Sequence, residues 1–112
     1  MKQGTNFILP VNIEYDLKFI EKIEFIFKQS KPGESLKNSK TIKKFEYPSD
    51  VAVAIEEGNT INLYWNIDDT YLFDVNNLIL MDTRIYLKDS EQNPETPIIK
   101  IRMNPTLFGQ GD

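Results

Sequence analysis

The sequence predicts an all-β fold, and two observations carry that prediction. Apolar residues recur at every second position in several segments, which is the spacing of a strand with one buried face. These segments are short, and turn-forming Pro, Gly, Asn and Asp residues separate them. We therefore expect an antiparallel, immunoglobulin-like β-sandwich of about seven strands, with one short helical turn near residues 67–73.

Three segments show the alternation most clearly. The positions expected to face the core are Ile23, Phe25 and Phe27 in the first, Ile61, Leu63 and Trp65 in the second, and Ile79, Met81, Thr83, Ile85 and Leu87 in the third. Less regular strands are expected at residues 6–14, 40–46, 51–57 and 96–104. Pro10 cannot donate a hydrogen bond to a strand ladder, so the strand that contains it should lie at an edge or a bend.

One segment is typical of a hairpin, because Gly58-Asn59 is a two-residue connection that suits a primed turn. A tight turn at this point pairs Ala54 with Leu63 and Ala52 with Trp65. Small residues then face large ones, which favours this side of the sheet as the inner face. A bulge would shift the register by one residue and reverse the two faces.

Residues 66–73 are the segment with the features of a helix start. Asn66 is a favourable N-cap, and Asp68 and Asp69 would lie in the first turn, where the helix dipole favours acids. We expect one or two turns, α or 3₁₀, that bridge two strands. Leu72 or Phe73 should then close one end of the core.

The length of 112 residues fits one domain over residues 1–112 and is too short for two ordinary domains. Folding at this length removes roughly 65% of the unfolded chain's surface from water. The apolar content of 40% supplies material for a core and excludes general disorder.

The chain contains no His and no Cys. Their absence excludes Ser–His and Cys–His nucleophile systems, zinc sites built on Cys or His, haem ligation by His, iron–sulfur clusters and disulfides. The glycines form no phosphate-binding motif. We expect no catalytic, cofactor or metal site and a protein that is not an enzyme, since an enzyme would have to work with carboxylates, Lys, Tyr or Ser alone.

Three acidic segments each have a structural explanation beside a chemical one. Asp68, Asp69 and Asp74 form a cluster that a divalent cation would favour, yet helix capping accounts for two of them. Residues 89–95 place oxygen-bearing side chains at alternate positions but lack the Gly and the final Glu of an EF-hand loop. Glu56-Glu57 would need to face each other across a cleft to act on a sugar, whereas neighbours on a strand point to opposite faces.

The net charge of −4 disfavours nucleic acid as a partner, because domains that bind it are usually basic. The charge is also uneven. Residues 18–44 hold eight lysines and three glutamates, whereas residues 45–95 hold two basic residues and eleven acids. This asymmetry either steers a partner or lets copies meet head to tail, or it marks two solvated loop regions.

The N-terminal segment offers only a short apolar run before Pro10, so no secretory signal peptide is expected. No apolar stretch approaches the ~20 residues that a membrane span requires. The lack of Cys suits a reducing compartment. We expect a soluble protein made in the cytoplasm, with no membrane as a partner.

The alternation places Tyr64 and Tyr86 on the strand faces that point away from the expected core, together with Leu80 and Ile26. Exposed Tyr and Leu residues on a sheet form either a protein-binding patch or a platform on which a sugar stacks. Alternatively, a second sheet covers them and the inner face is assigned wrongly. These four residues are the candidate interface.

Several motifs along the chain are similar to motifs in a group of other proteins. They are the opening Met1–Asn6 with Phe7–Pro10 behind it, Ile23–Gln29, Lys43-Lys44, Tyr47–Val51, Gly58-Asn59, Asp68–Phe73 and Asp82–Asp89. In these motifs the chain resembles a group of small uncharacterised proteins encoded in phages and prophages of Firmicutes. The resemblance implies a small immunoglobulin-like sandwich encoded among phage structural genes, and it brings no catalytic residues. Residues 105–109 replace the acidic tail of that group, so the 105–112 tail has no assigned role.

The resemblance and the lack of catalytic groups together predict a non-catalytic structural or protein-interaction module. It would be a tail, baseplate or capsid accessory component of a phage or prophage virion, made in the cytoplasm of the bacterial host. Its partners would be other protein subunits or further copies of the same chain. The alternative is a module that binds cell-surface carbohydrate, for which Tyr64 and Tyr86 are the motivation.

Overall fold

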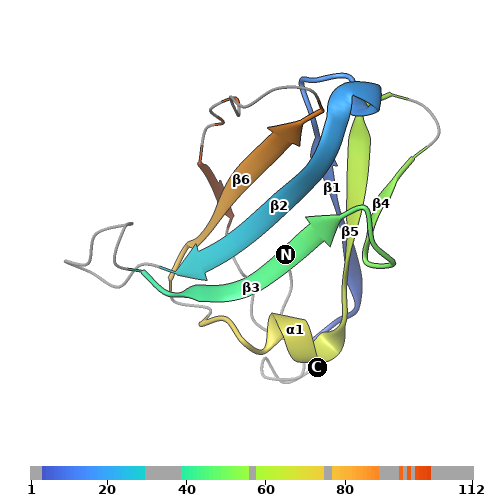
Figure 1. The fold of residues 1–112 in the computed structure, drawn as a ribbon. Helices are drawn as coiled ribbons and strands as arrows, with labels where there is room; N and C mark the ends of the chain where they lie inside the picture. Colours follow the sequence, from blue (N-terminus) through green and yellow to red (C-terminus); the bar gives the residue numbers. More distant parts are fainter. Residues whose placement is uncertain are drawn as a thin grey trace.

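The fold is taken from a computed structural model, which describes residues 4–29, 39–55, 58–74, 77–88, 94, 96 and 98–101. In this part of the chain seven strands form two sheets that face each other (Figure 1), which confirms the predicted antiparallel sandwich. The first sheet has the order β1-β5-β4, with β1 at Phe7–Asn12, β5 at Thr60–Trp65 and β4 at Ala52–Ala54. The second has the order β3-β2-β6-β7, with β3 at Thr41–Tyr47, β2 at Ile20–Gln29, β6 at Ile79–Leu87 and β7 at Ile99–Ile101.

The two sheets form a β-sandwich whose strand order differs from that of an immunoglobulin constant domain. β2 lies between β3 and β6, whereas the second strand of an immunoglobulin constant domain shares a sheet with the first. The chain passes from one sheet to the other between β3 and β4, where Ser49 and Ala52 form an isolated bridge. β1 is an edge strand, as Pro10 predicts, and Pro10 pairs with Asn62 of β5.

The β4–β5 hairpin forms in a different register from the predicted one. Ala52 pairs with Leu63 and Ala54 pairs with Ile61, so the pairing is shifted by two residues. The N–H of Ile55 donates to the carbonyl of Thr60 at 3.1 Å, and the connection is therefore longer than the predicted two residues. Because side chains alternate with a period of two, the shift preserves the faces, and the predicted inner face is confirmed by the burial of Ala52 and Leu63.

Two short helical turns lie at opposite ends of the sandwich (Figure 1): the 3₁₀ turn η1 at Leu17–Phe19 and the α-helix α1 at Ile67–Thr70. Asn66 caps α1, as the sequence predicts. Of the two residues expected to close the core, Phe73 is buried and Leu72 is exposed. Phe73 lies beyond the helix, at the end where β5 enters α1.

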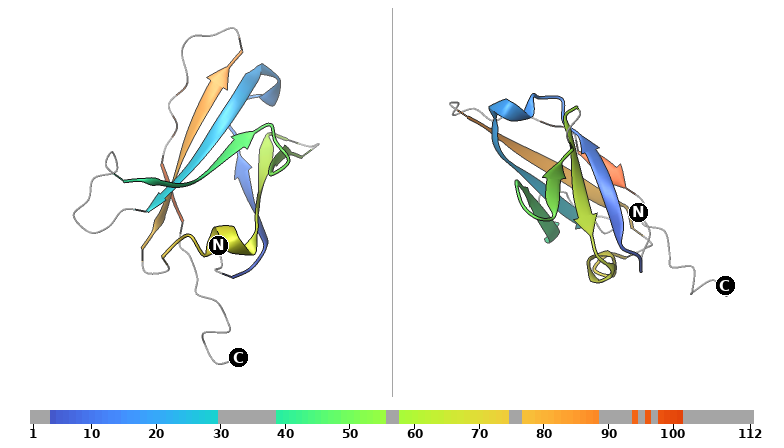
Figure 2. Two further views of the ribbon diagram at one scale, coloured as in Figure 1. Left: turned by 60° about the horizontal axis from the view of Figure 1, so that its bottom comes forward. Right: turned by 90° about the vertical axis from the view of Figure 1, so that its right-hand side faces the viewer.

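The core between the sheets is built around Trp65 of β5. Its ring centroid lies 4.8 Å from that of Phe27 in an edge-to-face arrangement, and 5.0 Å and 5.5 Å from those of Phe45 and Phe73. These residues come from both sheets and from the segment after α1. Figure 2 shows the two sheets from two further directions. Among the described residues no hydrogen-bond acceptor lies at the buried indole Nε1, and the aromatic contacts hold Trp65 in place.

Truncation of Phe27 tests this core. Because Phe27 is fully buried against Trp65, we expect Phe27→Ala to lower the free energy of unfolding by about 3–5 kcal/mol. The same truncation at exposed Phe19 should change it by no more than about 0.5 kcal/mol. Urea denaturation followed by circular dichroism measures both, and equal effects of the two variants would contradict the assignment of the core.

Candidate interaction surface

The structure divides the four predicted interface residues between two surfaces. Tyr64 lies on the outer face of the three-stranded sheet and is 40% exposed. Tyr86, Leu80 and Ile26 lie on the outer face of the four-stranded sheet, where Leu80 and Ile26 are only 8% and 6% exposed. The four residues therefore do not form one patch, and the two tyrosines do not share a platform.

Ile26 and Leu80 are buried because they lie on the two central strands of their sheet. Ile26 on β2 has Lys44 of β3 on one side and Asp82 of β6 on the other. Leu80 on β6 lies between residues of β2 and β7 in the same way. The sequence pattern places both residues on the outer face, but exposure also depends on strand order, which the pattern does not contain.

Tyr86 belongs to a polar network on the same outer face. Its hydroxyl donates to Oε1 of Glu24 at 2.5 Å, and Lys44 forms an ion pair with the other oxygen of that carboxylate. The ammonium group of Lys22 lies 4.6 Å from the centre of the Tyr86 ring. The network links β2, β3 and β6, and it engages both the ring and the hydroxyl of Tyr86 within the chain.

The network changes the protonation equilibria of its members. Hydrogen bonds from Lys44 and Tyr86 to its carboxylate hold the pKa of Glu24 below the ordinary value. The same carboxylate raises the pKa of Lys44 and that of Tyr86. Glu24 is therefore ionised and Lys44 protonated at neutral pH, and the arrangement stabilises the sheet without presenting a proton donor or acceptor poised to react.

The outer face of the three-stranded sheet has a different character. Its residues are Ile8, Pro10 and Asn12 of β1, Thr60, Asn62 and Tyr64 of β5, and Val51, Val53 and Ile55 in β4 and its flanks. We call these residues the neutral face, because they include no Asp, Glu, Lys or Arg.

The neutral face is ordered in rows across the three strands. Tyr64 pairs with Ile8 of β1, and its N–H donates to the carbonyl of Val51 at 2.8 Å. The next row places Asn62 between Pro10 and Val53. The five large side chains of the face are all between 40% and 49% exposed, so an apolar surface extends from one edge of the sheet to the other.

The alternation pattern places Tyr64 on this outer face but does not single out the residues around it. A signal was present, since Val51 to Ile55 is apolar at every position and Phe7 to Leu9 is apolar at three in succession. In a strand with one face in the core and the other in water, polar residues are expected at alternate positions. An uninterrupted apolar run in such a strand indicates that its outer face is also suited to burial.

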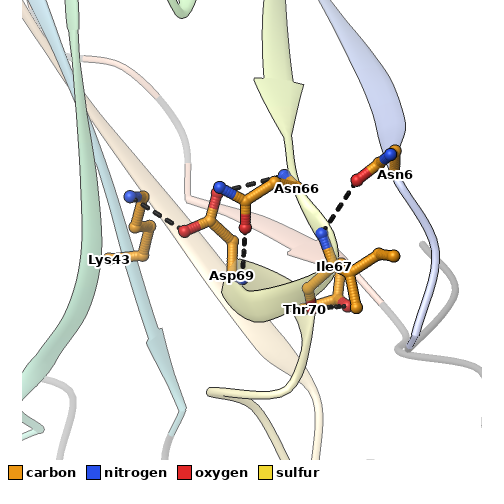
Figure 3. Close-up of polar contacts among 6 residues, drawn as sticks. All are labelled: Asn6, Lys43, Asn66, Ile67, Asp69 and Thr70. Carbon is orange, nitrogen blue, oxygen red and sulfur yellow. Dashed lines mark hydrogen bonds and ion pairs between the residues drawn. The ribbon is translucent and has the colours of Figure 1, made fainter.

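Of the acidic residues near α1, Asp69 has its partners within the fold. Figure 3 shows Asp69 between Asn66 and Lys43: its Oδ2 accepts from the backbone N–H of Asn66 at 3.1 Å, and its Oδ1 lies 3.0 Å from the ammonium of Lys43. Asn6 joins the same helix to the N-terminal segment, because its Oδ1 accepts from the N–H of Ile67 at 3.0 Å. The carboxylate of Asp69 thus caps α1 and ties it to β3.

A cleft of about 140 Å³ opens between β1 and the β6–β7 pair. Its apolar walls include Val11, Ile13, Ile85 and Ile99, and Glu14 is the one carboxylate among the described lining residues. The volume is close to that of an engineered apolar cavity that admits benzene, about 150 Å³. The cleft has room for one apolar group, and its described lining residues do not pair a carboxylate with a basic side chain.

The other predicted segments lie outside the described residues: Glu56-Glu57, residues 89–93 and 95, and the 105–112 tail. In the part of the chain that the structure describes, no three acidic side chains gather where they could hold a metal ion. The helices of that part are too short to cross a membrane. In comparisons with known proteins, the sequence matches no protein-family model and no curated protein.

The variant Glu24→Gln tests the polar network through the pH dependence of stability. Because the folded-state pKa of Glu24 is lowered, the carboxylate stabilises the fold at pH values above the pKa that Glu has in the unfolded chain, about 4.3. That stabilisation is lost as the pH falls through the lower, folded-state pKa. The Tm of the wild type should therefore be higher than that of Glu24→Gln at neutral pH, and this difference in Tm should shrink as the pH falls. Glu21→Gln lies at an exposed position of the same strand, and its Tm should differ little from that of the wild type at any pH. If the Tm difference between the wild type and Glu24→Gln persisted in strong acid, the assigned role of the Glu24 carboxylate would be wrong.

Proposed function

We propose that this protein is a non-catalytic interaction module that binds other protein subunits through the neutral face. The observation that carries the proposal is the composition of that face: exposed Ile8, Val51, Val53, Ile55 and Tyr64 on a sheet surface without Asp, Glu, Lys or Arg. These five exposed side chains adjoin one another on one face, whereas exposed apolar residues on protein surfaces are ordinarily scattered singly. Depletion of charge with an aromatic residue present is the composition of an interface core.

The polar residues of the neutral face also suit a protein partner. Asn12, Thr60 and Asn62 are uncharged, and each side chain can donate or accept hydrogen bonds. Such residues can pair with a partner's polar groups at much lower desolvation cost than a charge. A charged partner surface, in contrast, would lose its hydration without finding an opposite charge on this face.

The class of partner follows from the resemblance to phage and prophage proteins. We infer a tail, baseplate or capsid accessory protein, made in the host cytoplasm and incorporated into a virion. A small sandwich that presents one apolar face is suited to such a role, because particle assembly consists of repeated contacts between subunits. Carbohydrate binding is the second candidate, and it rests on Tyr64 with Asn62 on the same face, since Tyr86 is engaged by Glu24 and Lys22.

Incorporation into particles tests the proposal. Particles of the phage or induced prophage that encodes the chain would be purified on a density gradient, and its peptides quantified by mass spectrometry. The wild-type chain should be present in fixed proportion to the other subunits. Val53→Glu places a charge in the middle row of the neutral face, and we expect it to reduce incorporation at least about tenfold, equivalent to about 1.4 kcal/mol of binding energy.

Leu72→Glu is the matched control, because Leu72 is an exposed apolar residue that does not belong to the neutral face and the substitution adds the same charge. It should be incorporated like the wild type. Circular dichroism and the fluorescence of Trp65, the single tryptophan of the chain, establish that both variants fold. A wild-type chain absent from purified particles, or normal incorporation of Val53→Glu, would refute the proposal.

A further inference from the structure

We propose that the neutral face binds the neutral face of a second copy of this chain, with two three-stranded sheets packed face to face about a two-fold axis. The inference rests on the proposed function, because it names one partner of the same surface. Two properties of the described residues support a second copy: the distribution of charge and the nature of the sheet edges.

Charge restricts which surfaces of two copies can meet. Each copy has a net charge of −4, so copies repel each other at long range. The outer face of the four-stranded sheet carries Lys22, Glu24, Lys28, Lys44, Glu46, Asp82, Arg84 and Lys100. In a two-fold contact residue i of one copy meets residue j of the other, so burying this face would desolvate every one of these charges and require each to meet an opposite charge. The neutral face has none of these charges and can be desolvated against itself without that cost.

The edges of the three-stranded sheet favour contact through its face. Pro10 lies on the edge strand β1 and has no N–H to donate to a further strand. The opposite edge, β4, is only three residues long. Edge-to-edge extension into a continuous sheet is therefore disfavoured, and face-to-face packing is the arrangement that covers the apolar rows. Sheets packed in this way lie about 10 Å apart with their strands within about 30° of each other.

The size of the face sets the strength of the contact. Three strands about 4.8 Å apart and five residues in length give a footprint of about 14 Å by 17 Å. The area that two copies bury is then below the roughly 1,000 Å² of a stable dimer. We therefore expect a weak, reversible dimer with a Kd in the micromolar range or higher. Many copies in one particle would strengthen such a contact through avidity.

Asn62 provides the sharpest test, because it lies in the middle row of the face and on the middle strand. A two-fold axis near this position brings the two Asn62 side chains close together. Asn62→Asp or Asn62→Lys alone then sets two like charges against each other. An equimolar mixture of the two variants instead sets opposite charges against each other and restores association.

Sedimentation velocity over a concentration series measures these states. The mean mass of the wild type should rise with concentration from that of one chain toward that of two. Asn62→Asp and Asn62→Lys should each raise the Kd at least about tenfold, and their mixture should return it to the wild-type value or below. Leu72→Glu should associate like the wild type.

A wild type that remains monomeric throughout the series overturns the inference, and so does an Asn62→Asp variant that associates normally or a mixture that stays monomeric. Circular dichroism and Trp65 fluorescence again establish that the variants fold. If the wild type is monomeric and Val53→Glu is not incorporated into particles, the proposed function stands. Only the second copy is then rejected as the partner. Failure of both experiments would reject the neutral face itself.

Discussion

The packing of Trp65 joins the two sheets of the sandwich and determines which side of each strand faces inward. Its ring meets Phe27 and Phe45 from the opposite sheet and Phe73 from the segment after α1. This contact fixes the inward side of β5, and alternation along the strand then directs Tyr64 outward. The position of the neutral face is thus a consequence of the core, because each inward residue of the three-stranded sheet determines an outward neighbour.

The outer faces of the two sheets differ in how their side chains interact with water. On the four-stranded sheet, Glu24 is nearly buried but is satisfied by Lys44 and Tyr86, and charged residues keep the surrounding surface hydrated. On the three-stranded sheet, large apolar side chains remain in contact with water and no neighbouring element of the described chain covers them. A free energy gain therefore remains available from burying that face, at about 25 cal/mol per Å² of apolar surface. Association with another protein surface is the direct way to realise it.

Much of the fold could be predicted from the sequence because side-chain alternation is a local property. The seven strands, the edge position of Pro10, the Asn66 cap and the inner face of the β4–β5 hairpin all follow from residues close together in the chain. The predicted register of the β4–β5 hairpin is wrong by two residues, because the length of the turn sets the register and alternation does not. The burial of Ile26 and Leu80 and the continuity of the neutral face depend on strand order. Ile8, Val53 and Tyr64 come from three separate strands, and only the β1-β5-β4 order places them side by side.

Hydroxyl-radical footprinting of the chain, free in dilute solution and mixed with its proposed partner subunits, shows whether the neutral face is an interface, because side-chain oxidation reports exposure residue by residue. Tyr64 and Tyr71 provide an internal comparison, since both are exposed tyrosines, at 40% and 54%, and only Tyr64 belongs to the neutral face. If the neutral face is the interface, binding protects Tyr64, together with Ile8 and Val53, and leaves Tyr71 reactive. Protection of Tyr71 while Tyr64 stays as reactive as in the free chain would contradict it.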